Sequence, residues 1–231
     1  MATTNQMIQN YLSSKGVTSD NRSLMLDMQE AQIPSALLMK DAEKFVRRIY
    51  ELIMAGKRIV VYGDYDADGV CATTTMVRAL RELAMILTGK PGKIKYFIPH
   101  RFIDGYGMKP KTIDKLRDKF PKTDVIITVD NGIVAFDAIE YAKSLGYEVI
   151  VTDHHGGVDG RNPNCDIVVN PNRYDDEYPF KGISGTTVVY KLFLEVAKRY
   201  CPEHLDKFRA FVDFAGISTI SDVMPVLYEN R

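Results

Sequence analysis

The chain has 231 residues, of which 45% are hydrophobic and 26% are charged, and its 30 basic residues balance its 30 acidic ones. This composition is typical of a globular protein and excludes attraction to nucleic acid or to a membrane through overall charge. No uncharged apolar run approaches about 18 residues, which argues against a membrane span. The three cysteines, Cys71, Cys165 and Cys201, are far apart and lack CxxC spacing, which predicts reduced thiols in a cytoplasmic protein.

The spacing of apolar residues predicts alternating helices and strands along the chain. In order, we expect a weak helix over 3–13, an irregular segment over 17–36, a helix over 41–55, a strand over 58–62, a helix over 70–87, a strand over 93–98, a basic helix over 110–119, a strand over 124–129, a helix over 134–145, strands over 148–152 and 167–169, and helices over 185–199 and 203–220. Apolar strands that alternate with helices are typical of a parallel sheet with helices on both faces. The sequence therefore predicts an α/β domain over 41–231, preceded by a helical or irregular segment over 1–40.

An acidic turn, Gly-Asp-Tyr-Asp-Ala-Asp-Gly over 63–69, joins the strand over 58–62 to the helix that follows it. Its carboxylates are Asp64, Asp66 and Asp68. Two negative charges about 4 Å apart repel by roughly 4 kcal/mol at an effective dielectric constant near 20, and a helix N-terminus offsets about 0.3–1 kcal/mol for each exposed carboxylate. Two interpretations remain open: Asp68 caps the helix and the other two are solvated, or the carboxylates bind a hard divalent cation.

Other polar groups also follow the ends of predicted strands. Asp130 follows the strand over 124–129, and Asp153, His154 and His155 follow the strand over 148–152. Taken singly, Asp130 fits a helix cap and the two histidines fit a polar turn. Because the carboxyl ends of parallel strands share one edge of the sheet, however, we expect these groups to converge there with the acidic turn. Carboxylates with one or two imidazoles suit Mn²⁺ or Mg²⁺ better than structural zinc, and a two-ion site needs a bridging carboxylate.

Four ordered motifs resemble those of the DHH phosphoesterase superfamily. They are GDYDADG over 63–69, VDNGI over 129–133, DHH over 153–155 and TISDVMP over 219–225. The segments IPHR over 98–101, GYG over 105–107, SG over 184–185 and ENR over 229–231 are similar to the RecJ branch of single-strand-specific exonucleases. The resemblance covers roughly residues 24–231. It implies a DHH catalytic domain over 41–231 with its metal site at the carboxyl ends of the strands, and without the second domain that RecJ enzymes carry.

The resemblance also implies a cofactor of two Mn²⁺ ions, with Mg²⁺ as an alternative. By matching motifs, Asp66 is expected to bind one ion and Asp68 the other, while Asp130 bridges both ions. His154 and Asp222 are expected to complete the shell of the second ion. We interpret the chain as either an excised domain or a short natural relative.

The same resemblance implies roles in catalysis and substrate binding. His155 is expected to face the substrate phosphate as a charge stabiliser or proton donor, and Asp64 to act as an outer ligand or to fix the turn. Asp153 is expected to orient His154, as carboxylates commonly do for ligating imidazoles. Arg101 and His100 are expected to bind the substrate, with Arg101 holding a phosphate, against the alternative that Arg101 is an ordinary surface residue.

The resulting prediction is a manganese-dependent phosphodiesterase that degrades single-stranded DNA from its 5′ end. Its expected partners are single-stranded DNA or short oligonucleotides, other DNA repair or replication proteins, and no membrane. Alternatives are a short-oligonucleotide or cyclic-dinucleotide phosphodiesterase of the same superfamily, or a non-catalytic replication or repair scaffold. The presence of every expected ligand type argues against the scaffold. A pyrophosphatase of the superfamily is disfavoured, because the first motif of those enzymes resembles a His-containing version, whereas this chain has Asp-Tyr-Asp over 64–66.

Overall fold

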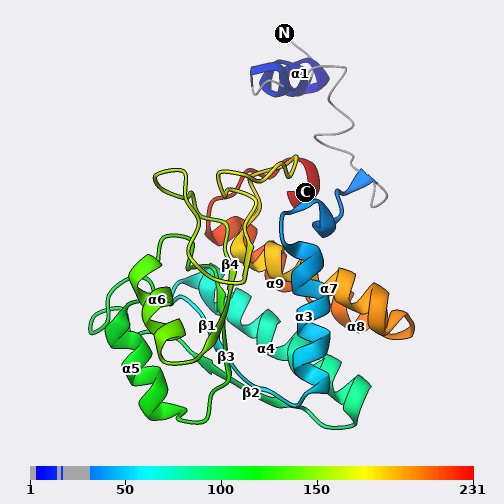
Figure 1. Cartoon of the computed structure of the whole chain (residues 1–231). Helices are drawn as coiled ribbons and strands as arrows, with labels where there is room; N and C mark the ends of the chain where they lie inside the picture. Colours follow the sequence, from blue (N-terminus) through cyan, green and yellow to red (C-terminus); the bar gives the residue numbers. More distant parts are fainter. Residues whose placement is uncertain (1–3, 15–16, 18–31) are drawn as a thin grey trace.

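The computed structural model describes residues 4–14, 17 and 32–231 (Figure 1). In this part of the chain, five parallel strands form one sheet in the order β2-β1-β3-β4-β5. They are β1 (Arg58–Tyr62), β2 (Lys93–Phe97), β3 (Val125–Val129), β4 (Glu148–Thr152) and β5 (Ile167–Val169). The expected strands are confirmed to within about a residue at each end, and so is the α/β fold class.

Helices cover both faces of the sheet (Figure 1). The first face packs against α3 (Ala42–Met54), α4 (Ala67–Thr88) and α7 (Gly185–Tyr200), and the second against α5 (Pro110–Lys119) and α6 (Phe136–Ser144). Successive side chains of a strand point to opposite faces. Each central strand is apolar at nearly every position because both of its faces are buried.

The remaining elements of the described residues are short or lie near the chain ends. They are α1 (Thr4–Ser14), η2 (Ala36–Leu38), η3 (Pro202–His204), α8 (Leu205–Arg209), α9 (Val212–Ser221) and η4 (Tyr228–Asn230). The helix α1 matches the expectation for 3–13. Most of the irregular segment expected over 17–36, namely 18–31, lies outside the described residues.

The prediction of one continuous helix over 203–220 is wrong. The chain changes direction between α8 and α9, where Phe211 N–H donates to the Phe208 carbonyl oxygen and Phe214 N–H to that of Phe211, each at 3.1 Å. These tighter bonds bring both Phe208 and Phe211 into the core, with exposed fractions of 0% and 5%. The change of direction lets α8 pack on α7 while α9 packs on both α4 and α7.

The order of the strands creates a switch point between β1 and β3. The chain leaves β1 through α4 to reach β2 on one side, and then passes through α5 to β3 on the other side. In this strand order the crevice between the carboxyl ends of β1 and β3 is where ligands bind. The acidic turn follows β1 and Asp130 follows β3, so both lie at this crevice.

Two further findings bear on the sequence predictions. Within the described residues, none of the helices combines the length and the apolar composition that crossing a membrane requires. Cys71, Cys165 and Cys201 are free thiols, as their spacing predicts.

Candidate metal centre

Four side chains from separate parts of the chain converge at the switch point, and we call them the candidate metal centre: Asp68, Asp130, His154 and Asp222. The Nε2 atom of His154 lies 3.1 Å from Oδ1 of Asp130, 3.5 Å from Oδ2 of Asp222 and 3.6 Å from Oδ2 of Asp68. One atom from each of Asp68, His154 and Asp222 falls within 4.8 Å of the others. This spacing suits a shared cation.

Asp68 is oriented by the N-terminus of α7. Its Oδ2 accepts from Gly185 N–H at 2.8 Å, and its Oδ1 accepts from Thr186 N–H at 2.8 Å and from the Thr186 hydroxyl at 2.6 Å. A carboxylate is stabilised by the free N–H groups and by the dipole of a helix N-terminus. The interpretation of Asp68 as the cap of its own helix is therefore wrong. Asp66 occupies that position, and its Oδ1 accepts from Gly69 N–H at 2.8 Å.

Asp130 is buried without a hydrogen-bond partner for either carboxylate oxygen. Its backbone has φ of 58°, in the left-handed region, and Gly185 of α7 packs against it. Burial, with the negative charges of Asp68, Asp153 and Asp66, raises the pKa of Asp130 to about 10. A carboxyl group in this position holds a proton at neutral pH unless a cation replaces that proton.

The unpaired buried atoms test whether a metal fits this site. They include both oxygens of Asp130, Oδ2 of Asp64 and Nε2 of His154. Buried polar atoms in native proteins nearly always have a partner, and carboxylate oxygens with an imidazole nitrogen are ligands of Mn²⁺ or Mg²⁺. The residues present therefore fit a hard divalent cation.

The carboxylate of Asp153 holds the ring of His155. Its Oδ1 lies 2.8 Å from Nδ1 of His155 and accepts from the backbone N–H of His154 at 2.7 Å. Burial opposes ionisation of Asp153, but the hydrogen bond and the charge of the His155 ring, with backbone N–H bonds from Ile133 and His155, keep the pKa of Asp153 below the usual range. The expectation that Asp153 orients the ring of His154 is wrong, because the ring that it contacts belongs to the next residue. An ionised carboxylate only accepts, so the proton between them lies on Nδ1.

The other ring nitrogen of His155 lies next to Tyr106, and the His155 side chain is partly exposed. Its Nε2 lies 3.3 Å from the hydroxyl of Tyr106. The hydrogen bond to Asp153 raises the pKa of His155, although burial opposes the shift. The Tyr106 side chain, which comes from the loop after β2, also packs edge-on against Tyr65 of the acidic turn, with ring centroids 6.4 Å apart.

The first two carboxylates of the acidic turn lie outside the ligand clusters of the described residues. Asp64 is buried, its Oδ1 accepts from Tyr65 N–H at 2.8 Å, and burial raises its pKa. A Cβ on Gly69 would lie 2.6 Å from the Asp64 backbone, so only glycine allows the turn to pack this closely on the start of α4. Asp66 is exposed and caps α4.

Two of the three predicted substrate-binding residues, Arg101 and His100, lie on the loop after β2, whereas the third, His155, follows β4. The guanidinium of Arg101 sits over the ring of Tyr65, 5.4 Å from its centroid, which places it beside the acidic turn. His100 is exposed, and its ring lies 6.0 Å from that of Phe102. The structure therefore connects Arg101 with the site through Tyr65, whereas the described contacts of His100 stay within its own loop.

Sequence reasoning assigned no role to Gly185, Thr186 or Tyr106. Ser184 caps α7 by accepting from Thr187 N–H at 3.2 Å, so the Ser-Gly pair marks a helix start. That local signal was readable in the sequence. The partner of this helix start, Asp68, was not, because it lies 118 positions before Thr186 in the chain.

Comparisons with known proteins agree with this arrangement. The profile of the DHH family, N-terminal domain, matches residues 58–217. The single-stranded-DNA-specific exonuclease RecJ of Escherichia coli (strain K12) is 34% identical over 201 residues, which cover 84% of this chain and 33% of that protein. The RecJ of Bacillus subtilis (strain 168) is 33% identical over 214 residues, covering 93% of this chain and 25% of that protein. The chain thus spans about a third or less of the curated relatives that it matches.

Solved structures give the same result. A crystal structure of exonuclease RecJ bound to manganese superposes with a TM-score of 0.69 at 30% identity, covering 86% of this chain and 47% of that one. The RecJ of Thermus thermophilus in complex with Mn²⁺ superposes with a TM-score of 0.68 at 27% identity, covering 95% of this chain and 29% of that one. With the parallel sheet and the motifs at its carboxyl edge, these matches lead to one conclusion: the chain belongs to the DHH family.

Proposed function

We propose that this domain binds two divalent cations, preferentially Mn²⁺, and hydrolyses phosphodiester bonds from the 5′ end of single-stranded DNA. The observation that carries the proposal is the cluster of buried, unpaired ligand atoms on Asp130 and His154 at the switch point. The similarity to RecJ exonucleases, including RecJ structures that contain manganese or magnesium, supports both the ion type and the substrate class.

We assign the ligands by combining motif and geometry. Asp68, His154 and Asp222 would hold one ion, and Asp130, whose two carboxylate oxygens are both unpaired, would be shared with a second ion. Asp66, whose exposed carboxylate caps α4 through Gly69 N–H, is assigned by its motif as the residue that would bind the second ion. Ions held there supply Lewis-acid activation of water and charge stabilisation at phosphorus.

His155 is assigned to the substrate phosphate. The Asp153 carboxylate holds its Nδ1, and Nε2 lies beside Tyr106 on a partly exposed side chain. The raised pKa of His155 favours the protonated ring, which donates from Nε2 to a phosphate oxygen or to the leaving group. Asp64, buried behind the turn, fixes the backbone that carries Asp66 and Asp68.

The contacts around the site support recognition of the end of a nucleic acid. Tyr65 and Tyr106 offer aromatic rings next to the guanidinium of Arg101, a combination that suits a base and its phosphate. Two lysines on the same side already have partners in Asp104: Lys109 donates to its carbonyl oxygen, and Lys115 forms an ion pair with its carboxylate. We therefore expect this domain to contact few nucleotides, and to cleave weakly, distributively and with strong sensitivity to salt.

The test is a time course on a long, end-labelled single strand with Mn²⁺, with unlabelled competitor added after initiation. We expect mononucleotide release from the 5′ end that stops when the competitor is added, and little cleavage of duplex DNA. Asp130→Ala, purified in parallel, controls for contaminating nuclease. Cleavage of short oligonucleotides or cyclic dinucleotides alone would favour those substrates instead. Metal binding without cleavage of any of these would favour a scaffold.

A further inference from the structure

Asp222 differs from the other proposed ligands because it lies at the C-terminal end of a helix. It caps α9, and the residues after it, 223–230, form a segment that we call the return segment. Met224 N–H donates to the Thr219 carbonyl at 2.9 Å, and Val223 N–H to that of Ile220 at 3.2 Å. These two bonds form a Schellman motif, which sets the direction of the chain immediately after Asp222.

The return segment contains strained backbone. Val223, at the position that glycine usually occupies in this motif, has φ of 55°, and Tyr228 has φ of 49°. A left-handed conformation is unfavourable for a β-branched residue, and it persists only where the surroundings enforce it. Some contact beyond the helix end therefore has to hold the return segment in place.

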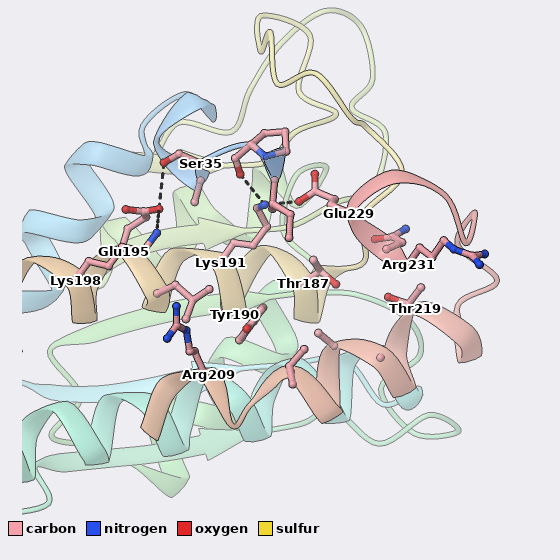
Figure 2. Close-up of a pocket in the computed structure, with 18 of the residues that line it drawn as sticks. Ser35, Thr187, Tyr190, Lys191, Glu195, Lys198, Arg209, Thr219, Glu229 and Arg231 are labelled. Carbon is pink, nitrogen blue, oxygen red and sulfur yellow. Dashed lines mark hydrogen bonds and ion pairs between the residues drawn. The ribbon is translucent and has the colours of Figure 1, made fainter. Parts of the chain in front are cut away.

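That contact is a buried ion pair between Glu229 of the return segment and Lys191 of α7. Their side chains are 2% and 7% exposed. The Tyr178 hydroxyl donates its proton to the Glu229 carboxylate, 2.7 Å from Oε1 and 3.0 Å from Oε2. The Lys191 ammonium also donates to the Pro34 carbonyl oxygen at 2.7 Å (Figure 2). Every charged atom of the pair is thus hydrogen-bonded, the condition under which a buried pair is tolerated.

A second anchor lies next to the first. The Asn230 side-chain amide donates to the Gly182 carbonyl at 2.6 Å and to the Pro225 carbonyl at 3.0 Å. A Cβ on Gly182 would lie 2.7 Å from the Pro225 ring, so the return segment packs directly on the chain that leads into α7.

The ion pair borders a cavity. A cavity of about 390 Å³ lies between α7 and α9, with Thr187, Lys191, Thr219 and Glu229 among its lining residues (Figure 2). The direct tie between the return segment and α7 beside this space is the ion pair of Glu229 with Lys191. The same helix binds Asp68 at its N-terminus.

We propose that Glu229, through its ion pair with Lys191, is a positioning residue that holds the return segment and thereby keeps Asp222 at the candidate metal centre. This inference rests on the proposed function, in which Asp222 is a metal ligand. Glu229 itself contacts neither metal nor substrate.

The experiment measures Mn²⁺ binding calorimetrically for the wild type, Glu229→Ala, Asp222→Ala and the double variant. We expect Glu229→Ala to weaken one of two Mn²⁺ sites by about 10- to 100-fold, as loss of an outer partner of a metal ligand commonly does. The double variant is expected to bind no more weakly than Asp222→Ala. Glu229→Gln keeps one acceptor oxygen but loses the charge that pairs with Lys191, so its Mn²⁺ affinity should lie between those of the wild type and Glu229→Ala. The matched control is Arg58→Met, which breaks an ion pair with Asp124 at the amino ends of β1 and β3, away from the candidate metal centre.

Several outcomes would overturn the inference. Wild-type Mn²⁺ affinity in a folded Glu229→Ala protein would show that the pair serves stability alone. A double variant weaker than Asp222→Ala would show that Glu229 acts by another route. If Glu229→Ala does not fold, Asn230→Ala provides the same test through the second anchor. In metal-free protein, unchanged hydrogen exchange of the Met224 amide in these variants would also count against the inference. Absence of Mn²⁺ binding by the wild type would contradict the proposed function itself.

Discussion

Gly185 packs directly on Asp130: a Cβ placed on Gly185 would lie 2.6 Å from Oδ1 and 3.0 Å from Cα of that aspartate. The two residues come from α7 and from the end of β3, and they meet because the N-terminus of α7 points into the switch point. The absence of a side chain at position 185 lets the same helix end bind Asp68 while Asp130 stays at the candidate metal centre.

Gly185→Ala should displace the Asp130 carboxylate. The added methyl group has to move backbone as well as side-chain atoms, so we expect Mn²⁺ affinity to fall by about 10- to 100-fold, in the range seen when a ligand's support is lost. Gly216→Ala, in α9 with open space around the new methyl group, is the control. That change should leave metal binding intact and stabilise the helix by roughly 0.5–1 kcal/mol. Calorimetry and thermal unfolding measure both effects, and equal metal binding by the two variants would contradict the assignment.

The stability of the metal-free protein should fall as pH rises. The pKa of Asp130 in the folded protein is raised to about 10 from an ordinary value of 3.8, so between these values the folded protein holds a proton that the unfolded chain has released. Its contribution to stability is then lost with rising pH, by up to about 1.4 kcal/mol per pH unit. The raised pKa of His155 acts in the same direction, whereas the lowered pKa of Asp153 has no effect above about pH 5.

Thermal unfolding in chelator from about pH 6 to 10 measures this trend. Asp130→Asn, neutral at every pH, should flatten the profile. Mn²⁺ should also flatten it in the wild type, because the cation replaces the proton, and calorimetry in two buffers should detect the released proton. A metal-free profile in which stability rises across this range would contradict the raised pKa of Asp130.

Variants of Asp130, the proposed bridge between the ions, and of His155, the proposed acid or base, should lose activity for different reasons. Asp130→Ala is expected to abolish turnover and weaken metal binding while the fold persists, because it removes the proposed bridge. His155→Ala should retain its metal ions and lose about 10²–10⁴-fold in turnover, the usual range for a general acid or base. Asp153→Asn should resemble His155→Ala in turnover, since it removes the carboxylate that orients the ring. Loss of metal by His155→Ala to the extent seen in Asp130→Ala would reverse these roles.

Thr186→Val should weaken the attachment of Asp68 without changing the shape of the side chain. The Thr186 hydroxyl donates to Asp68 Oδ1 at 2.6 Å, and a hydrogen bond to a charged group contributes roughly 1.5–3 kcal/mol. We expect a loss of that size in the free energy of unfolding, together with weaker Mn²⁺ binding. Thr74→Val, whose exposed hydroxyl bonds its own helix, should cost far less. Chemical denaturation with and without Mn²⁺ compares the two, and equal losses would contradict the role of Thr186.

The amino-acid sequence by itself determined the sheet and the location of the site. Largely apolar runs such as 125–129 and 148–152 become central strands because both of their faces are covered, and a polar residue follows each run. Since parallel strands share one carboxyl edge, placing Asp130 and His154 side by side required no long-range information beyond the parallel topology.

The tertiary structure decided which partner each of these polar groups has. Local capping rules do not distinguish Asp66 from Asp68, and the choice follows from the N-terminus of α7, which binds Asp68 from 117 and 118 positions away. Asp153 holds His155 rather than the ring of His154 because the turn after β4 directs the two rings differently. The approach of Gly185 to Asp130, the break before α9 and the tie from Glu229 to Lys191 likewise depend on packing between distant elements, to which local periodicity does not respond.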